Sequence, residues 1–244
     1  MRGPNRMNPF NTTGIPSILQ SVPEFLRPMI ALASDEELAH AKRVREDFFT
    51  EGGPGAYMND IIRAFRVARG CNTYIEVGSR DKGNVAWVST LADDNAHLID
   101  IDIEPNAQAE KKLLTYIKGT QKFTSIVGDS VGESTIAGLH EVLDGKLADV
   151  IFLDSSHMYS HMMRELDLYM PFLKPGGFML IHDILWEGNE WGKGKAQAAL
   201  MIDRILPVYS VVMDLPVHRF MLWETKQMDL WGGVGVIVKP TSIV

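Results

Sequence analysis

The sequence contains one cysteine and no long apolar run. Cys71 cannot form a disulfide within the chain, so no feature points to an oxidising compartment. A membrane-spanning helix needs about 20 consecutive apolar residues, and no stretch approaches that length. The amino terminus also lacks the continuous apolar segment of a secretory signal. We therefore expect a cytoplasmic protein that does not enter a membrane.

Basic residues are scarce relative to acidic ones. The chain of 244 residues has 24 Lys and Arg against 31 Asp and Glu, which gives a formal net charge of −7. Nucleic-acid binding needs clustered Lys and Arg, and here the basic residues are scattered. This excludes a broad nucleic-acid surface and favours a small-molecule partner. The hydrophobic content of 45% is enough for one substantial core.

The chain divides into an arm and one domain. Residues 1–30 begin with a polar stretch rich in Pro, Gly and Asn, and they are expected to form a flexible arm. Residues 31–244 contain no repeat or long linker and are expected to form a single domain, with a helical cap over 31–70 and a core over 71–244. A second copy covering the arm would most easily order it, so we expect a homo-oligomer, most simply a dimer.

Two helices are predicted in the cap. The first covers residues 35–50, with Ser34 as its N-cap and acidic residues in its first turn. The second covers residues 56–69, where apolar residues gather on one side and Gly70 follows. Both helices should therefore pack an apolar side against the rest of the domain.

After residue 71, short apolar runs alternate with helical segments, which predicts an α/β fold with a doubly wound, mostly parallel sheet and helices on both faces. The helix after residue 156 has a polar side that includes His161 and Glu165. KPGG (174–177) predicts a tight turn, and residues 218–224 are ambiguous between strand and loop. The predicted strands are 73–77, 96–101, 123–128, 149–154, 178–183, 209–215 and 234–239.

Acidic residues follow the first three predicted strands. In a parallel sheet the ligand crevice lies beyond the carboxyl ends of the strands. Glu76 precedes Gly78, which permits a tight turn, but the spacing is not the three-glycine dinucleotide fingerprint. Asp102 can accept both hydroxyls of a ribose, and a solvated loop acid is the alternative. With Asp129 in reach of an adenine amino group, these acids favour a cationic, ribose-bearing ligand without a pyrophosphate.

The order of these motifs resembles the class I S-adenosylmethionine-dependent methyltransferases over residues 70–185. Within that superfamily the chain resembles the metal-dependent O-methyltransferases of sugars and glycosylated natural products, including the macrocin and mycinamicin types. The resemblance implies a Rossmann-like, seven-stranded methyltransferase domain, S-adenosylmethionine as cofactor and a sugar, glycoside or oligosaccharide as acceptor. The motifs are YIEVGS, HLIDIDIEP, GDS, DVIFLD and LKPGGFMLIHD.

The resemblance also implies cofactor contacts. Arg80, Asp81 and Lys82 depart from the smaller, glycine-rich residues of the commonest form of the family, which alters this loop. The implied contacts are Glu76, Gly78 and Ser79 at the methionine portion, Asp102 at the ribose, Asp129 and Ser130 at the adenine, and Asp154 close to the cofactor.

Methyl transfer to a hydroxyl needs a base or a metal that makes the oxygen nucleophilic. Asp154 and Asp183 end two strands, and their oxygens suit Mg²⁺ or Mn²⁺. The resemblance implies Asp154 and His157 as the catalytic pair, with His157 as general base. His182 is either a further metal ligand or a structural group on the opposite face of the sheet, because neighbouring strand residues alternate sides. His161 is interpreted as a surface residue, or as the base if His157 points away.

Two other functions stay open at this stage. A catechol-type O-methyltransferase shares the chemistry of vicinal hydroxyls, but it usually has an Asp-Asn pair after the fifth strand, and here Ile184 follows Asp183. A non-catalytic relative that binds a nucleoside ligand is the second alternative.

Overall fold

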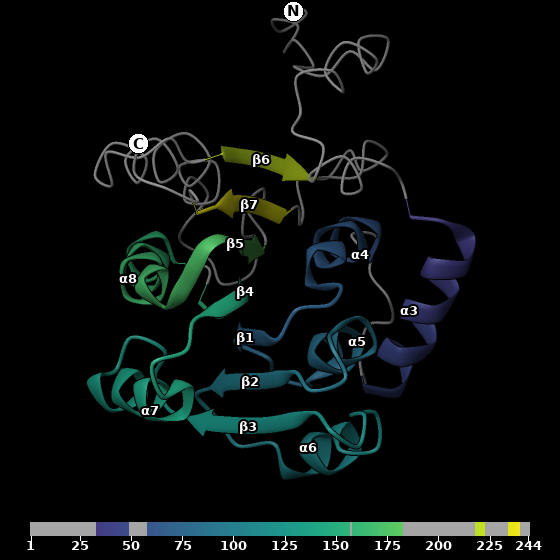
Figure 1. The fold of residues 1–244 in the computed structure, drawn as a ribbon, viewed down its shortest axis with the longest axis horizontal. Coiled ribbons are helices and arrows are strands. Elements are labelled where there is room, and N and C mark those ends of the chain that lie inside the picture. Colours follow the sequence, from purple (N-terminus) through teal and green to yellow (C-terminus); the bar gives the residue numbers. More distant parts are fainter. Residues whose placement is uncertain (1–32, 49–57, 157, 183–217, 223–233, 240–244) are drawn as a thin grey trace, which may run out of the picture.

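A seven-stranded sheet forms the centre of the molecule, in the order β3-β2-β1-β4-β5-β7-β6 (Figure 1). The structure is a computed structural model, and it describes residues 33–48, 58–156, 158–182, 218–222 and 234–239. The predicted arm over residues 1–30 lies outside this part.

The first five strands pair in parallel, and β7 runs antiparallel to both β5 and β6. This confirms the predicted mostly parallel sheet. Residues 209–215 lie outside the described part, and the ambiguous segment at 218–224 supplies β6. The strands are β1 (Thr73–Val77), β2 (His97–Asp102), β3 (Lys122–Val127), β4 (Ala148–Leu153), β5 (Leu173–His182), β6 (His218–Leu222) and β7 (Val234–Val238).

Helices cover both faces of the sheet. In Figure 1, α4, α5 and α6 lie on one side with α3 outside them, and α7 and α8 lie on the other. Successive strand residues point to opposite faces, so each face has its own buried apolar cluster. None of the described helices is long and apolar enough to cross a membrane. The helices are α3 (Asp35–Phe48), α4 (Met58–Phe65), α5 (Gly83–Leu91), α6 (Ala107–Leu113), α7 (Glu133–Leu143) and α8 (Tyr159–Tyr169), with the 3₁₀ turns η3 (Arg66–Ala68) and η4 (Met170–Phe172).

The first cap helix begins with a reciprocal pair of hydrogen bonds. The Glu37 backbone N–H donates to Ser34 Oγ at 3.2 Å, and the Ser34 N–H donates to Glu37 Oε2 at 3.0 Å. This capping box satisfies two backbone donors that the helix itself leaves unpaired. The Glu37 carboxylate also accepts from Arg66 at 2.8 Å, which ties α3 to η3. The predicted N-cap at Ser34 is therefore confirmed.

Replacing Ser34 with Ala is expected to lower the free energy of unfolding by about 1 kcal/mol, because the Glu37 N–H loses its acceptor. Urea unfolding followed by circular dichroism measures the change. Ser34→Asp is the control, since an Asp side chain can accept the same hydrogen bond. A loss of equal size in both variants would contradict the cap.

The tight turn predicted at residues 174–177 falls within the bounds of β5, where it interrupts the pairing with β4. Ala148 pairs with Leu173 and Val150 pairs with Phe178, so residues 174–177 bulge out opposite Asp149 alone. Gly176 has φ 77° within this bulge, a conformation that favours glycine. The strand thus continues through the segment and delivers His182 to the carboxyl end of the sheet.

Candidate active site

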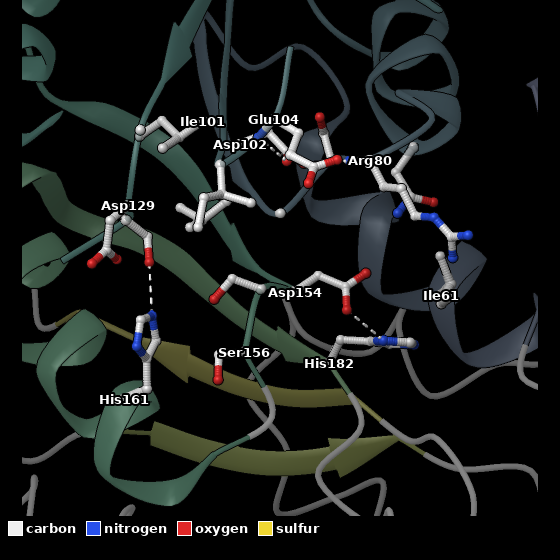
Figure 2. A pocket seen from close by; sticks show the side chains of 18 residues that line it. Ile61, Arg80, Ile101, Asp102, Glu104, Asp129, Asp154, Ser156, His161 and His182 are labelled. Carbon is white, nitrogen blue, oxygen red and sulfur yellow. Dashed lines mark hydrogen bonds and ion pairs between the residues drawn. The ribbon is translucent and has the colours of Figure 1, made fainter. Parts of the chain in front are cut away.

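A pocket of about 690 Å³ lies at the carboxyl ends of β1 to β5 (Figure 2). We call it the strand-end pocket. Its wall comes from the segments that follow β1, β2, β3 and β4, from α8, and from the last residue of β5. Here β1 lies between β2 and β4, so the strand order reverses direction, which is where parallel sheets bind ligands.

Gly78 allows the ends of β1 and β4 to approach each other. It has φ 87°, and a Cβ at this position would overlap the backbone of Asp154 and Ser155. The Asp154 N–H donates to the Val77 carbonyl at 2.8 Å across the same junction. Gly78 and Ser79 both line the pocket, and their contact with a cofactor stays a prediction.

Asp102 fixes the edge of the pocket after β2. Its Oδ2 accepts from the Arg80 N–H at 2.7 Å, and its Oδ1 accepts from the Glu104 N–H at 3.1 Å. Each carboxylate oxygen has a second lone pair, so Asp102 can still accept a ligand hydroxyl from within the pocket. Figure 2 shows it near Arg80 and Glu104, with Asp129 further along the wall.

Glu76 is fully buried beneath the pocket and is not one of the residues lining it. The Tyr74 hydroxyl donates to Glu76 at 2.8 Å, and Asn84 Nδ2 donates at 3.2 Å. Burial raises the pKa of Glu76 to about 8, against the lowering effect of the Tyr74 hydrogen bond. Asn84, which the sequence reasoning missed, lines the pocket in front of Glu76. Direct contact of Glu76 with a cofactor stays a prediction.

The loop that departs from the family pattern contains a buried ion pair. Lys82 and Asp100 are fully buried and paired, and Ser125 Oγ donates to Asp100 at 3.0 Å. Arg80 and Lys82 have φ 45° and 59°, left-handed conformations that glycine adopts at less cost. The ion pair therefore accompanies a strained loop conformation.

Asp154 and His182 meet at the ends of β4 and β5. His182 Nδ1 lies 2.8 Å from Asp154 Oδ1, and both side chains line the pocket (Figure 2). His182 therefore faces the pocket and not the opposite side of the sheet, and its role as a metal ligand stays a prediction. His157 and Asp183 lie outside the described residues, so their roles stay predictions. Within the described part, no three His, Cys, Asp or Glu residues are grouped to hold a metal.

His161 and Glu165 of α8 lie on a side of the helix that faces protein. Glu165 is fully buried, whereas His161 is half-buried and lines the pocket. Ser130 Oγ donates to Glu165 at 2.5 Å, Ser155 Oγ also donates to it, and His161 Nε2 lies 3.3 Å from the carboxylate. Burial raises the pKa of Glu165, and the two serine hydrogen bonds act in the opposite direction. The sequence signal was the i, i+4 His and Glu pair.

The strand order and the strand-end pocket define a Rossmann-like fold. Residues 75–184 match the family model described as a methyltransferase domain. No curated protein matches the chain.

Solved methyltransferases share this fold. The O-methyltransferase TomG from Streptomyces achromogenes, involved in tomaymycin synthesis and solved with SAM, is 13% identical with a TM-score of 0.55, covering 85% of this chain and 92% of its own. The O-methyltransferase from Bacillus cereus, solved with SAH, is 12% identical with a TM-score of 0.54, covering 93% and 97%. The mycinamycin-pathway methyltransferase MycE, solved with Mg and SAH, is 14% identical with a TM-score of 0.56, covering 82% and 55%.

The predicted resemblance to class I S-adenosylmethionine-dependent methyltransferases is confirmed by these matches. At identities of 12% to 14%, the solved structures show the fold. The acceptor and the metal are therefore matters for proposal.

Proposed function

We propose that the protein is an S-adenosylmethionine- and divalent-metal-dependent O-methyltransferase that acts on a hydroxyl of a sugar, glycoside or oligosaccharide. One observation carries the proposal: Asp154 and His182 meet at 2.8 Å in the wall of a pocket that Asp102 and Asp129 line elsewhere. We call the part of the pocket lined by Asp102 and Asp129 the nucleoside end, and the part lined by Asp154 and His182 the transfer end.

The donor set of the pocket fits the cofactor. Asp102 and Asp129 offer carboxylate oxygens to ribose hydroxyls and an adenine amino group, and the acidic wall suits a cation. When bound, S-adenosylmethionine supplies a methyl carbon already activated by its sulfonium leaving group. Gly78 and Ser79 allow the ligand to approach the backbone closely. The chain's own task is to orient the acceptor oxygen and remove its proton.

The transfer end fits a divalent cation in its donor chemistry. Carboxylate oxygen suits Mg²⁺ and Mn²⁺, and imidazole nitrogen suits Mn²⁺ better. Asp154 and His182 provide one of each, and we propose Asp183 as the third ligand. A cation held there supplies a Lewis acid that lowers the pKa of an acceptor hydroxyl. We propose His157 as the general base, since it follows Asp154 by three residues.

Calorimetric titration with S-adenosylhomocysteine, in Mg²⁺ and in EDTA, tests the cofactor. A labelled-methyl transfer screen over glycosides and catechols tests the acceptor. We expect S-adenosylhomocysteine to bind and transfer to glycosides to stop in EDTA. Absence of binding in both conditions would refute the whole proposal, and EDTA-insensitive transfer would refute the metal. Transfer to catechols alone would make the catechol alternative correct.

Replacing Asp154 with Asn is expected to lower kcat at least about 100-fold, because the transfer end loses its carboxylate. Steady-state kinetics in saturating Mg²⁺ measures the loss. Asp144→Asn is the matched control, because Asp144 is exposed at the end of α7 with φ 49°, a conformation that Asn tolerates. Equal kcat in the two variants, with S-adenosylhomocysteine still bound, would show that the Asp154 carboxylate has no part in the transfer step.

A further inference from the structure

A hydrogen-bonded cluster joins three segments of the pocket wall. Its members are Ser130 after β3, Ser155 after β4, and His161 and Glu165 on α8. The Glu165 Oε1 accepts from both serine hydroxyls, and His161 Nε2 lies 2.9 Å from Ser130 Oγ. Ser130, Ser155 and His161 all line the pocket, whereas Glu165 is buried behind them. The carboxylate is therefore the common anchor of the three.

The proton count of the cluster fixes the His161 tautomer. Ser130 donates its only hydroxyl proton to Glu165, so its oxygen must accept from His161. His161 Nε2 then carries a proton, and in the neutral ring Nδ1 is an acceptor. The imidazole thus brings an acceptor nitrogen to the pocket wall.

Packing alone does not require a carboxylate at position 165. The neighbouring α8 residues Met162, Leu166 and Tyr169 are buried in the apolar cluster, so an apolar side chain would suit the same position. A buried carboxylate costs several kcal/mol unless hydrogen bonds offset the loss of water. The Glu165 carboxylate instead holds the side chains of Ser130, Ser155 and His161 in place.

The cluster lies at the nucleoside end of the pocket. Ser130 directly follows Asp129, and its carbonyl accepts from the Tyr169 hydroxyl at 2.9 Å. Figure 2 shows His161 on the Asp129 side, whereas Asp154 and His182 lie together elsewhere in the pocket. Ser155 directly follows Asp154, but Ser130 and His161 lie on the Asp129 side, so a change in the cluster should act mainly on nucleoside binding.

We propose that Glu165 is a positioning residue for the adenosine part of the cofactor: it holds Ser130, Ser155 and His161 as a preorganised wall, and His161 is a nucleoside contact. This inference rests on the proposed function, because it takes the ligand to be S-adenosylmethionine. Preorganised contacts bind more tightly because less freedom is lost on binding.

Titration with two ligands separates the ends of the pocket. S-Adenosylhomocysteine contains the nucleoside and the amino-acid part, whereas 5′-methylthioadenosine contains the nucleoside and lacks the amino-acid part. Glu165→Ala is expected to weaken both ligands by the same factor, about 10- to 100-fold, since hydrogen bonds to a charged group are lost. Asn84→Ala, beside Glu76 at the proposed methionine portion, is the matched control and should weaken S-adenosylhomocysteine alone. Glu165→Gln keeps an acceptor oxygen and should stay within about threefold of wild type.

Kinetics give a second readout. Glu165→Ala should raise the KM for S-adenosylmethionine and leave kcat at saturation nearly unchanged, because the transfer end is intact. If Glu165→Ala does not fold, His161→Ala serves instead and should weaken both ligands about 5- to 10-fold. Unchanged affinity, or a loss confined to S-adenosylhomocysteine, would overturn the inference while the proposed function stands. Failure of wild-type protein to bind either ligand would refute the proposed function itself.

Discussion

Replacing Lys82 with Ala is expected to lower the free energy of unfolding by about 3 to 5 kcal/mol, because Asp100 then becomes an uncompensated charge in the core. The Lys82 side chain is 1% exposed and that of Asp100 is 0% exposed. Ser125 is a further donor to Asp100, but a single hydroxyl does not replace a cation. A chain of this size loses roughly 2 to 4 °C in Tm for each kcal/mol, so the fall in Tm should be about 6 to 20 °C.

Urea and thermal unfolding of matched variants measure this effect. Lys42→Ala is the control, because Lys42 and Glu46 form an exposed ion pair at 3.5 Å. Exposed pairs contribute little, so Lys42→Ala should change stability by less than about 1 kcal/mol. The double variant Lys82→Met with Asp100→Asn removes both charges and should recover most of the loss. A cost below about 1 kcal/mol for Lys82→Ala would show that the pair is not a buried charge pair in solution.

A second substitution at position 82 tests the contribution of the backbone conformation to stability. Its φ of 59° costs a non-glycine residue about 1 to 2 kcal/mol. Lys82→Gly should therefore be less destabilising than Lys82→Ala, although it removes the same cation. This loop thus combines a residue in the left-handed conformation with a buried ion pair. The commonest form of the family that the sequence resembles has smaller residues at these positions.

The sheet was predictable because its central strands β1 and β4 are buried on both faces. Short apolar runs such as 73–77 and 149–154 give a signal that depends only on local sequence, and their observed bounds differ by at most one residue. The strand at 218–222 stayed ambiguous in the sequence. Its pairing is antiparallel to β7 at the edge of the sheet, and such pairing depends on contacts distant in sequence.

The site was predictable where it depends on strand direction alone. Parallel strands end at the same edge, so Asp102, Asp129, Asp154 and His182 meet in one pocket. Glu165 was missed because periodicity assigns it to a polar side of α8, and only hydrogen bonds from two separate loops make that side buried. Periodicity describes a single helix, whereas the hydrogen bonds of this cluster join α8 to the segments that follow β3 and β4.

Glu76 should make the unliganded protein lose stability as the pH rises from about 5 to about 8. Burial raises the pKa of its carboxyl from 4.5 to about 8 in the folded state, and the charges of Asp154 and Asp100 also raise it. Between these two values the folded state keeps a proton that the unfolded state has released, so raising the pH favours unfolding. The loss levels off above about pH 8, when both states are ionised. At about 1.4 kcal/mol per pH unit, the total loss is about 3 to 5 kcal/mol.

Glu76→Gln should remove this pH dependence, because an amide carries no proton that titrates in the range. Urea unfolding at several pH values measures it, with Glu141→Gln on the exposed side of α7 as the control that keeps the wild-type slope. Identical slopes in wild type and Glu76→Gln would mean that Glu76 is ionised throughout.

The Glu76 carboxyl should also couple to binding of the proposed cofactor, because a cation bound beside Asn84 favours the ionised form of Glu76. Calorimetry near pH 7 in buffers of different ionisation enthalpy should then show the release of up to about one proton per S-adenosylmethionine bound. Glu76→Gln should bind without that release, since it has no proton to lose.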